Sequence, residues 1–546
     1  MSESKLLRGT FVLTLGTYIS RILGMIYLFP FAALVGDVGG ALFGYGYNQY
    51  AIYLSIATMG VPMAVSRFVS KYNALGDYYT SRRMFRAGIK MMFITGLVTF
   101  AFLYIMAPFL AKATLGNQEL NNSLADVTMV IRMVSVALII VPMMSIIRGF
   151  FQGHQSMGPT SVSQVVEQLA RVVFLLVSTY IVMRVFHGSM ALAVGFATFG
   201  AFIGALAGLA VLFWYWKKRK PNLDKLLAQS VEPAQMTTMQ MFKELFSYAG
   251  PFVFIGLAIP LYQYIDQFTF NKAMVAAGQA DKAEYMYGII QSWVPKLIMI
   301  PVSLATAFGL TLVPTITSSY ASGQYDLLKK QIDQTYQTIM FLVLPAVVGL
   351  IVLAYPAYNF LFTGSKDGGF VLMMYAPVAL LFSYFTVNAA ILQGINKQKY
   401  AVISLIVGLI VKISTNSLFI MWLGGTGSIV STALGYVISI VYTSAMIQNN
   451  AEYKATVFWK RTVLMFAFAA LMGLSVWIVE FLLSFAVNYE DGRIAAGIIT
   501  IAGATVGLAV YGILTYRTGL LEKVMGSRIV GVIQRRLLRK KVSKAS

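Results

Sequence analysis

Three basic side chains lie in stretches of the sequence that are otherwise strongly apolar. Arg21 lies within the run SRILG, Arg67 follows the run VPMAVS, and Lys296 stands five residues before Pro301. An ionisable group deep in a membrane-spanning helix costs at least about 2.5–3.5 kcal/mol on insertion scales, so it normally faces a partner or a wet cavity. Arginine binds oxyanions in a bidentate way, and lysine acts more as a point charge. The three cations predict a central cavity that attracts phosphate-like anions; the alternative is that each snorkels or closes an ion pair.

Four further charged residues lie inside apolar stretches. Glu167 and Arg171 are four residues apart, so on a helix they share one face and form an ion pair, and they can still line the cavity wall as substrate-binding residues. Asp266 is an acid that can bind a coupling cation or a proton, whereas Lys412 can instead neutralise it. Both interpretations of Asp266 and Lys412 stay open from the sequence.

Residues of the usual catalytic and metal-binding types are scarce. The chain of 546 residues has no Cys and two His, so disulfides, thiolate metal sites and histidine-based metal chemistry are not expected. We find no P-loop for ATP, no Rossmann glycines and no metal-ligand spacing. We therefore expect no enzyme activity, no catalytic residue and no resident cofactor, and we leave open a coupling ion of unknown identity.

The elements that must position these charges are membrane-spanning helices. Hydrophobic residues make up 58% and charged residues 11% of the chain, whereas a soluble domain is about 25% charged. Apolar runs of about 20 residues, the length that a helix needs to cross a bilayer, recur from Phe11 to Tyr516. We expect an all-α polytopic membrane protein with about fourteen transmembrane helices. The predicted spans are approximately 9–36, 42–69, 87–111, 127–150, 161–184, 189–216, 244–271, 284–318, 333–358, 370–393, 400–423, 427–448, 461–487 and 494–516.

The placement of the basic residues predicts the orientation of the chain. A formal net charge of +22 is compatible with a nucleic-acid partner, but the basic residues lie between apolar runs rather than on one soluble face. About 30 of the 42 Lys and Arg fall on one set of alternating loops and about six on the other, which is the bias that marks the cytoplasmic side. The first apolar run is too long for a cleaved signal peptide. We therefore expect a multi-pass protein with both termini in the cytoplasm.

An internal repeat divides the predicted helices. The run VPMAVS at 61–66 is echoed by VPTITS at 313–318, and FQGHQ at 151–155 is echoed by LQGIN at 392–396. Eighteen residues after the glycine of each QG pair comes a basic residue, Arg171 or Lys412. These echoes predict two pseudo-symmetric six-helix lobes followed by two additional helices. The predicted parts are an N-terminal lobe at 1–216, a cytoplasmic linker at 217–243, a C-terminal lobe at 244–450, the two extra helices at 451–518 and a basic tail at 519–546.

Glycine and proline pairs mark places where the predicted helices can break. Repeated bundles with broken helices are the usual architecture of secondary transporters, whose substrate site lies near the membrane midplane. The alternative is ordinary kinking, because glycine and proline are frequent in membrane helices. The candidate breaks are Gly24 with Pro30, Gly60 with Pro62, and Pro251 with Pro260.

Three segments resemble a known group of transporters. The runs RGTFVLTLGTYISRILGMIY, GVPMAVSRFVSKYNALGDY and FQGHQSMGPTSVSQVVEQLARV are similar to the multidrug/oligosaccharidyl-lipid/polysaccharide exporter superfamily. Within it, the chain most resembles the lipid II flippases of the MurJ type, in the Gram-positive branch that includes stage V sporulation protein B. The resemblance extends from about Lys5 to Arg517.

The resemblance implies a fold, a substrate and some residue roles. It implies an inverted V of two six-helix lobes around a cationic cavity, with a groove at 451–518 for a polyprenyl tail. The implied activity is transfer of lipid II, the undecaprenyl-pyrophosphate-linked peptidoglycan precursor, from the inner to the outer leaflet of the bacterial cell membrane by alternating access. Arg21 matches an essential family arginine, and Lys296 stands where the family has a cavity arginine. Tyr27 replaces a second arginine of Gram-negative members, and Lys412 argues against the sodium site of some relatives.

Other functions remain open at this stage. Export of another undecaprenyl-linked polysaccharide unit shares every feature named above. Multidrug efflux predicts an acidic cavity and about twelve spans, and a membrane transferase predicts a covalent product. The sequence does not distinguish membrane potential, protons and sodium as the driving force.

Overall fold

The computed structural model describes residues 3–58, 61–116, 120–231, 236–362, 365–453 and 456–525. Every regular element in these ranges is a helix, and none of them contains a strand. Ten segments of the described chain are long and apolar enough to cross a membrane, and the longest of these, Gln398–Ala451, joins two long helices in 54 residues. The protein is an all-α polytopic membrane protein, as the sequence predicts, and about fourteen crossings are consistent with these segments.

The chain divides into two compact units. The first runs from the N-terminal part to Trp293 and takes in Asn416–Gly425, and the second takes in Val294–Thr415 and the chain from Thr426 onward. The predicted lobe and linker boundaries stay a prediction, and most of the predicted basic tail, 526–546, lies outside the described residues.

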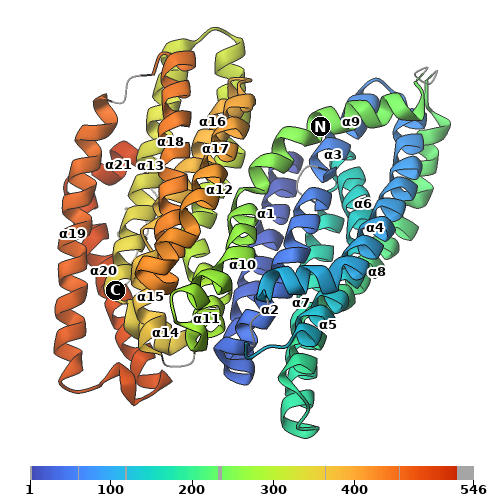
Figure 1. The fold of residues 1–546 in the computed structure, drawn as a ribbon. Helices are drawn as coiled ribbons and strands as arrows, with labels where there is room; N and C mark the ends of the chain where they lie inside the picture. Colours follow the sequence, from blue (N-terminus) through green and yellow to red (C-terminus); the bar gives the residue numbers. More distant parts are fainter. Residues whose placement is uncertain are drawn as a thin grey trace, which may run out of the picture. The chain divides into compact units, whose positions relative to one another are not determined.

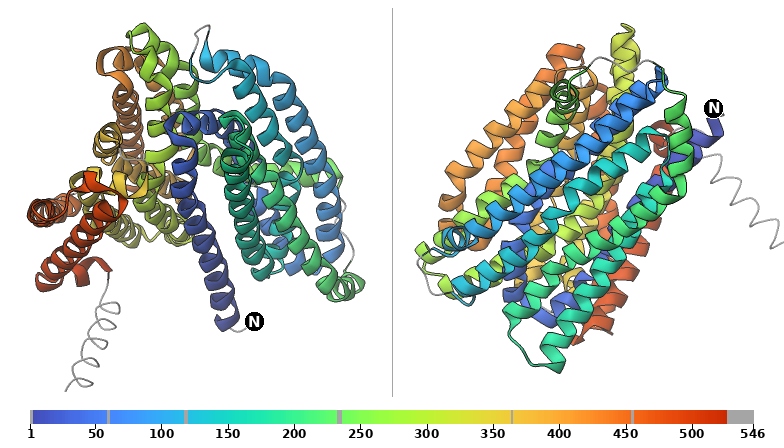
Figure 2. Two further views of the ribbon diagram at one scale, coloured as in Figure 1. Left: turned by 90° about the horizontal axis from the view of Figure 1, so that it is seen from below. Right: turned by 90° about the vertical axis from the view of Figure 1, so that its right-hand side faces the viewer.

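The first unit contains the helices labelled α1 to α11 in Figure 1. Among them, α7 and α8 pack side by side along their length (Figures 1 and 2). The bounds are α1 Glu3–Ile26, α2 Leu28–Thr58, α3 Val61–Ala74, α4 Tyr78–Leu115, α5 Leu124–Ser135, η1 Val136–Ile139, α6 Val141–Gly153, α7 Gly158–Tyr180, η2 Ile181–Val185, α8 Met190–Ala228, α9 Thr238–Gly256, α10 Ala258–Ala276, α11 Ala280–Tyr287 and η3 Gly288–Trp293.

The second unit contains most of the remaining helices. Helix α17 spans the division, because its residues from Asn416 onward belong to the first unit. The bounds are α12 Val294–Ala321, α13 Tyr325–Val352, α14 Ala354–Leu361, α15 Lys366–Tyr375, α16 Val378–Gly394, α17 Gln398–Leu423, η4 Gly424–Thr426, α18 Gly427–Ala451, α19 Thr456–Ser484, η5 Tyr489–Asp491, α20 Arg493–Arg517 and α21 Leu520–Met525.

Two of the prolines at the predicted helix breaks stand directly after the end of a helix. Helix α1 ends four residues before Pro30, and helix α9 ends four residues before Pro260. A proline ring clashes with the carbonyl four residues earlier and lacks the N–H that would bind it, so the helix stops at that carbonyl. The predicted single helix at 9–36 is therefore two helices, α1 and α2. Gly60 and the side chain of Pro251 lie outside the described residues.

Helix α8 continues well past the predicted end of its span at residue 216. It includes the basic run KKRKP and ends at Ala228. Lys220 Nζ lies 2.7 Å from Asp224 Oδ2, one turn further on, and such pairs stabilise a helix by a few tenths of a kcal/mol. The predicted span ends where the charged residues begin, because hydropathy marks only the apolar segment. The helical backbone continues beyond that segment.

The two QG echoes have the same local structure. Helices α6 and α16 end at Gly153 and Gly394. Two residues after each glycine the backbone is left-handed, with φ of 55° at Gln155 and 58° at Asn396. The next backbone N–H then turns back to a helical carbonyl, which is a Schellman-type C-cap.

The VP echoes pack against these same glycines, each within its own unit. A Cβ added at Gly153 would lie 2.9 Å from the carbonyl oxygen of Ser66, and one added at Gly394 would lie 3.4 Å from that of Val313. Close backbone approach therefore requires glycine at Gly153, whereas at Gly394 the tight contact, at 2.5 Å, is with the side chain of Ile316. The two glycines meet different positions of the echo, because Ser66 corresponds to Ser318 and not to Val313, so the feature that both units share is the helix end itself.

Candidate functional site

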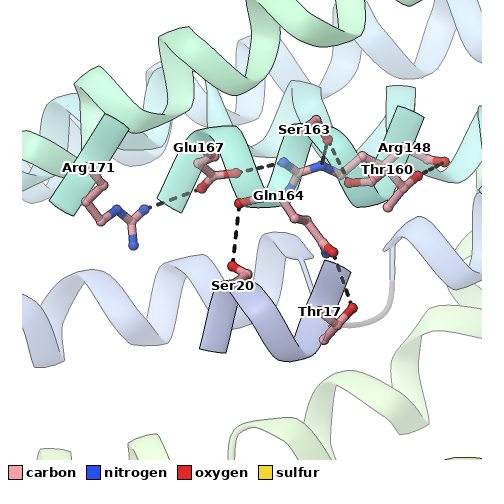
Figure 3. A network of polar contacts seen from close by, with 8 residues as sticks. All are labelled: Thr17, Ser20, Arg148, Thr160, Ser163, Gln164, Glu167 and Arg171. Carbon is pink, nitrogen blue, oxygen red and sulfur yellow. Dashed lines mark hydrogen bonds and ion pairs between the residues drawn. The ribbon is translucent and has the colours of Figure 1, made fainter. Parts of the chain in front are cut away.

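Glu167 joins two arginines inside the first unit (Figure 3). Its Oε2 lies 2.7 Å from Arg148 Nη2, and its Oε1 lies 3.4 Å from Arg171 Nη2. The three side chains are 13–16% exposed, so the network is mostly withdrawn from the surface. The predicted ion pair of Glu167 with Arg171 is confirmed, and the group carries one excess positive charge.

Sequence reasoning missed Arg148. This residue lies near the end of the predicted span 127–150, where a basic side chain is read as part of the next loop. The structure places it on α6, facing α7, where its Nε also donates to Ser163 Oγ at 3.0 Å. An embedded carboxylate often binds more than one cation, which is a reason to search the sequence for a second partner of Glu167. Only the packing of α6 against α7 identifies Arg148 as that partner.

One face of α7 carries this polar network. Thr160, Ser163, Glu167 and Arg171 follow one another at spacings of three and four residues, so they lie along one stripe of the helix (Figure 3). The Thr160 hydroxyl donates to the backbone carbonyl of Arg148 at 3.4 Å. The contacts from Thr160 and Ser163 position Arg148, which in turn holds one oxygen of Glu167.

Helix α1, which carries Arg21, packs on a neighbouring part of α7. Thr17 Oγ1 donates to Gln164 Oε1 at 3.3 Å, and Ser20 Oγ donates to the Gln164 carbonyl at 3.4 Å (Figure 3). A Cβ added at Gly24 would lie 3.1 Å from Gln168 Nε2. These contacts fix the position of α1 along the axis of α7.

Arg171 has polar neighbours besides Glu167. Tyr50, Tyr47 and Tyr27 lie near its guanidinium. Its Nε is buried and has no hydrogen-bond partner among the described residues, whereas the Tyr50 hydroxyl lies within hydrogen-bonding reach of the Arg171 guanidinium. Buried polar atoms of this kind normally bind water or another polar group. The arrangement thus leaves the Arg171 Nε donor available inside the first unit.

The three embedded cations predicted for the cavity have different surroundings. Arg21 on α1 and Arg67 on α3 are exposed, and both belong to the first unit. Lys296 on α12 is half-buried and belongs to the second unit. Exposure of the two guanidinium groups is compatible with anion binding. Their substrate-binding roles, and the shared cavity, stay predictions.

Asp266 lies buried in the first unit with two amide donors. Gln291 Nε2 donates to its Oδ2 at 2.8 Å, and Asn416 Nδ2 donates to its Oδ1 at 2.9 Å. Asn416 Nδ2 also reaches Thr269 Oγ1 at 2.7 Å. Both carboxylate oxygens of Asp266 are therefore hydrogen-bonded within the first unit.

Lys412 is fully buried in the second unit. Its Nζ donates to the carbonyl oxygen of Ser428 and to Thr432 Oγ1, both at 2.8 Å. A buried ammonium is tolerated only where oxygen atoms replace its water shell. Ion coupling through Asp266 and Lys412 stays a prediction.

The comparison with known proteins decides the family. The family model described as "Polysaccharide biosynthesis protein" matches residues 6–320. The "Lipid II flippase MurJ" of Bacillus subtilis (strain 168) is 55% identical over 539 residues, which cover 98% of this chain and 99% of that protein. The chain belongs to the MurJ family. The resemblance stated from the sequence is thereby confirmed.

Two further comparisons place this MurJ family member. The "Stage V sporulation protein B" of Bacillus subtilis (strain 168) is 24% identical and covers 91% of this chain and 90% of that protein. A solved structure titled "Lipid II flippase MurJ, inward closed conformation" has a TM-score of 0.60 at 14% identity and covers 94% of this chain and 100% of that one. The structural likeness establishes a shared fold.

Proposed function

We propose that this MurJ family member is a lipid II flippase, which moves the undecaprenyl-pyrophosphate-linked precursor of peptidoglycan from the inner to the outer leaflet by alternating access. The observation that carries the proposal is the 55% identity, over 98% of the chain, to a protein of that name. Transfer across the bilayer requires no covalent step, which agrees with the scarcity of catalytic residue types.

The proposed substrate carries a pyrophosphate, and the embedded cations match that charge. Arg21 and Arg67 present exposed guanidinium groups in the first unit, and such groups can bind phosphate oxygens in a bidentate way. Lys296 offers a point charge in the second unit. We assign pyrophosphate binding to these three residues.

The Arg148–Glu167–Arg171 network has a different proposed role. Glu167 uses one oxygen for each arginine, so it holds both guanidinium groups in fixed positions. Arg171 retains a buried Nε without a partner among the described residues, beside the Tyr50 hydroxyl. We infer that Arg171 and Tyr50 bind a polar group of the substrate and that Glu167 positions Arg171.

The two extra helices supply a surface for the polyprenyl tail in this proposal. Helices α19 and α20 pack together and leave large apolar side chains exposed, including Trp477 at 54% and Leu508 at 78%.

We propose that the protein lies in the bacterial cell membrane with both termini in the cytoplasm, because of the asymmetric distribution of Lys and Arg.

The test is externalisation of lipid II in living cells. The protein is depleted in a strain from which related flippases are deleted, and lipid II that becomes accessible at the outer face is measured. We expect exposure to fall on depletion and to return on re-expression. Unchanged exposure would contradict the proposal. Accumulation of a different undecaprenyl-linked unit, with lipid II unchanged, would point to another polysaccharide substrate.

A further inference from the structure

A long apolar groove opens on the first unit between α4, α6 and α8. Its volume is about 620 Å³, and its lining includes exposed side chains of α8, such as Leu206 at 41% and Phe213 at 55%. The neighbouring face of α4 is also exposed and apolar, as Ile94 at 61% and Val98 at 62% illustrate. In a membrane protein, a surface of this kind faces acyl chains.

A basic pocket adjoins this groove at the start of α4. It has a volume of about 270 Å³, and Arg82, Arg83, Arg86 and Lys90 contribute to its lining. Arg82 connects the two features, because its guanidinium lies 4.4 Å from the ring centre of Trp216, a residue of the groove. Cationic and apolar surfaces therefore meet at one place.

The basic pocket has few acidic partners of its own. Arg82 lies 3.2 Å from Asp224, a carboxylate that also binds Lys220. Arg86 and Lys90 are exposed, and no ion pair of the described residues includes either of them. The local charge is strongly positive, so an anion from outside the chain complements it.

We propose that the groove and the basic pocket together form a binding site for one acidic phospholipid of the surrounding membrane. The headgroup phosphate lies on Arg86 and Lys90, and an acyl chain lies in the groove beside Phe213 and Trp216. The occupant is argued from charge complementarity and from the exposed apolar walls. The site is distinct from the Arg148–Glu167–Arg171 network, and it does not rest on the proposed lipid II transport.

The test measures which lipids the purified full-length protein retains. The protein in detergent receives equal amounts of phosphatidylglycerol and phosphatidylcholine with the same acyl chains, and bound lipid is counted by native mass spectrometry. We expect phosphatidylglycerol to be retained about tenfold more often, since its headgroup carries a net negative charge toward the two cations, whereas the choline group of phosphatidylcholine offsets its phosphate charge. Arg86→Ala combined with Lys90→Ala is expected to abolish this preference. Both side chains are exposed, so the fold tolerates the change.

Matched variants separate this site from a general effect of charge or of bulk. Lys397→Ala with Lys399→Ala removes the same charge from another unit and is expected to keep the preference. Ala210→Trp fills the groove and is expected to reduce lipid retention about fivefold, whereas Ala445→Trp at an exposed position of α18 is expected to have no effect.

Several outcomes would overturn the proposal. They are equal retention of the two lipids by the wild-type protein, loss of the preference in both double variants alike, and no effect of Ala210→Trp. Excess inorganic phosphate distinguishes a lipid from a free anion. If phosphate alone displaces the bound lipid completely, the basic pocket is an anion site and the groove has no part in it.

Discussion

The two units carry different charges at equivalent places of the repeat. In the first unit, the residues five before, fourteen after and eighteen after the QG glycine are Arg148, Glu167 and Arg171. In the second unit, the corresponding residues are Ala389, Gly408 and Lys412. The backbone is retained, because both glycines end a helix in the same way. One framework therefore supports an ion network in one unit and a single buried lysine in the other.

A serine hydroxyl occurs at the equivalent position of both units, between these charged residues. Ser163 Oγ donates to the carbonyl of Thr160 at 2.9 Å, and Ser404 Oγ donates to that of Ala401 at 2.7 Å. Only in the first unit does a guanidinium also reach this serine, since the partner position holds Ala389 in the second. The first unit therefore links α6 and α7 through charged side chains, whereas in the second unit Lys412 of α17 bonds to oxygen atoms of α18.

The largest expected effect concerns the cations proposed to bind the pyrophosphate in the two units. Arg21→Ala and Lys296→Ala are expected to abolish complementation of a flippase-depleted strain at normal protein levels. Lys296→Arg is expected to retain activity because charge is sufficient there, whereas Arg21→Lys is expected to lose most of it because bidentate geometry is lost. The measurement is growth together with immunoblotting. Normal growth of both alanine variants would refute the assignment.

The second prediction concerns the ion network of the first unit. Glu167→Ala leaves two guanidinium groups side by side with little exposure, so we expect it to destabilise the protein by about 3 kcal/mol and to lower its melting temperature in detergent.

Arg148→Ala with Glu167→Ala imitates the second unit and supplies the control. It removes one charge of each sign, so we expect it to recover at least half of the lost stability. If the double variant is less stable than Glu167→Ala alone, the two residues do not act as a pair.

The sequence predicted the local parts of this arrangement and missed the non-local ones. The pair of Glu167 with Arg171 follows from a spacing of four on one helix, and the break after α1 follows from Pro30. Arg148 was missed because its partner lies on the next helix, and chain spacing does not give the contact between α6 and α7. The helical end of α8 was also missed, since hydropathy reports the membrane segment and not the backbone beyond it.

A third, smaller effect concerns the lysine of the second unit. Lys412 is fully buried, so its four-carbon stem fills space in addition to carrying charge. Lys412→Met and Lys412→Ala both remove the charge, but only alanine leaves a cavity. We expect Lys412→Ala to be less stable than Lys412→Met by about 2 kcal/mol, measured by thermal unfolding of the purified protein. Equal stability of the two variants would show that the stem does not contribute to packing.

The smallest expected difference compares the two QG glycines directly. A methyl group at Gly153 would lie 2.5 Å from Val69 Cβ and 2.9 Å from a backbone carbonyl, whereas one at Gly394 would lie 2.5 Å from the methyl Cγ2 of Ile316 and 3.4 Å from the nearest carbonyl. A side-chain end can move more readily than a backbone, so Gly153→Ala is expected to destabilise the protein by about 1 kcal/mol more than Gly394→Ala. The melting temperatures of the two variants test this order. Both glycines end a helix in the same way, so the backbone propensity of glycine contributes equally to the two variants. A reversed order of melting temperatures would mean that α3 moves aside more easily than α12.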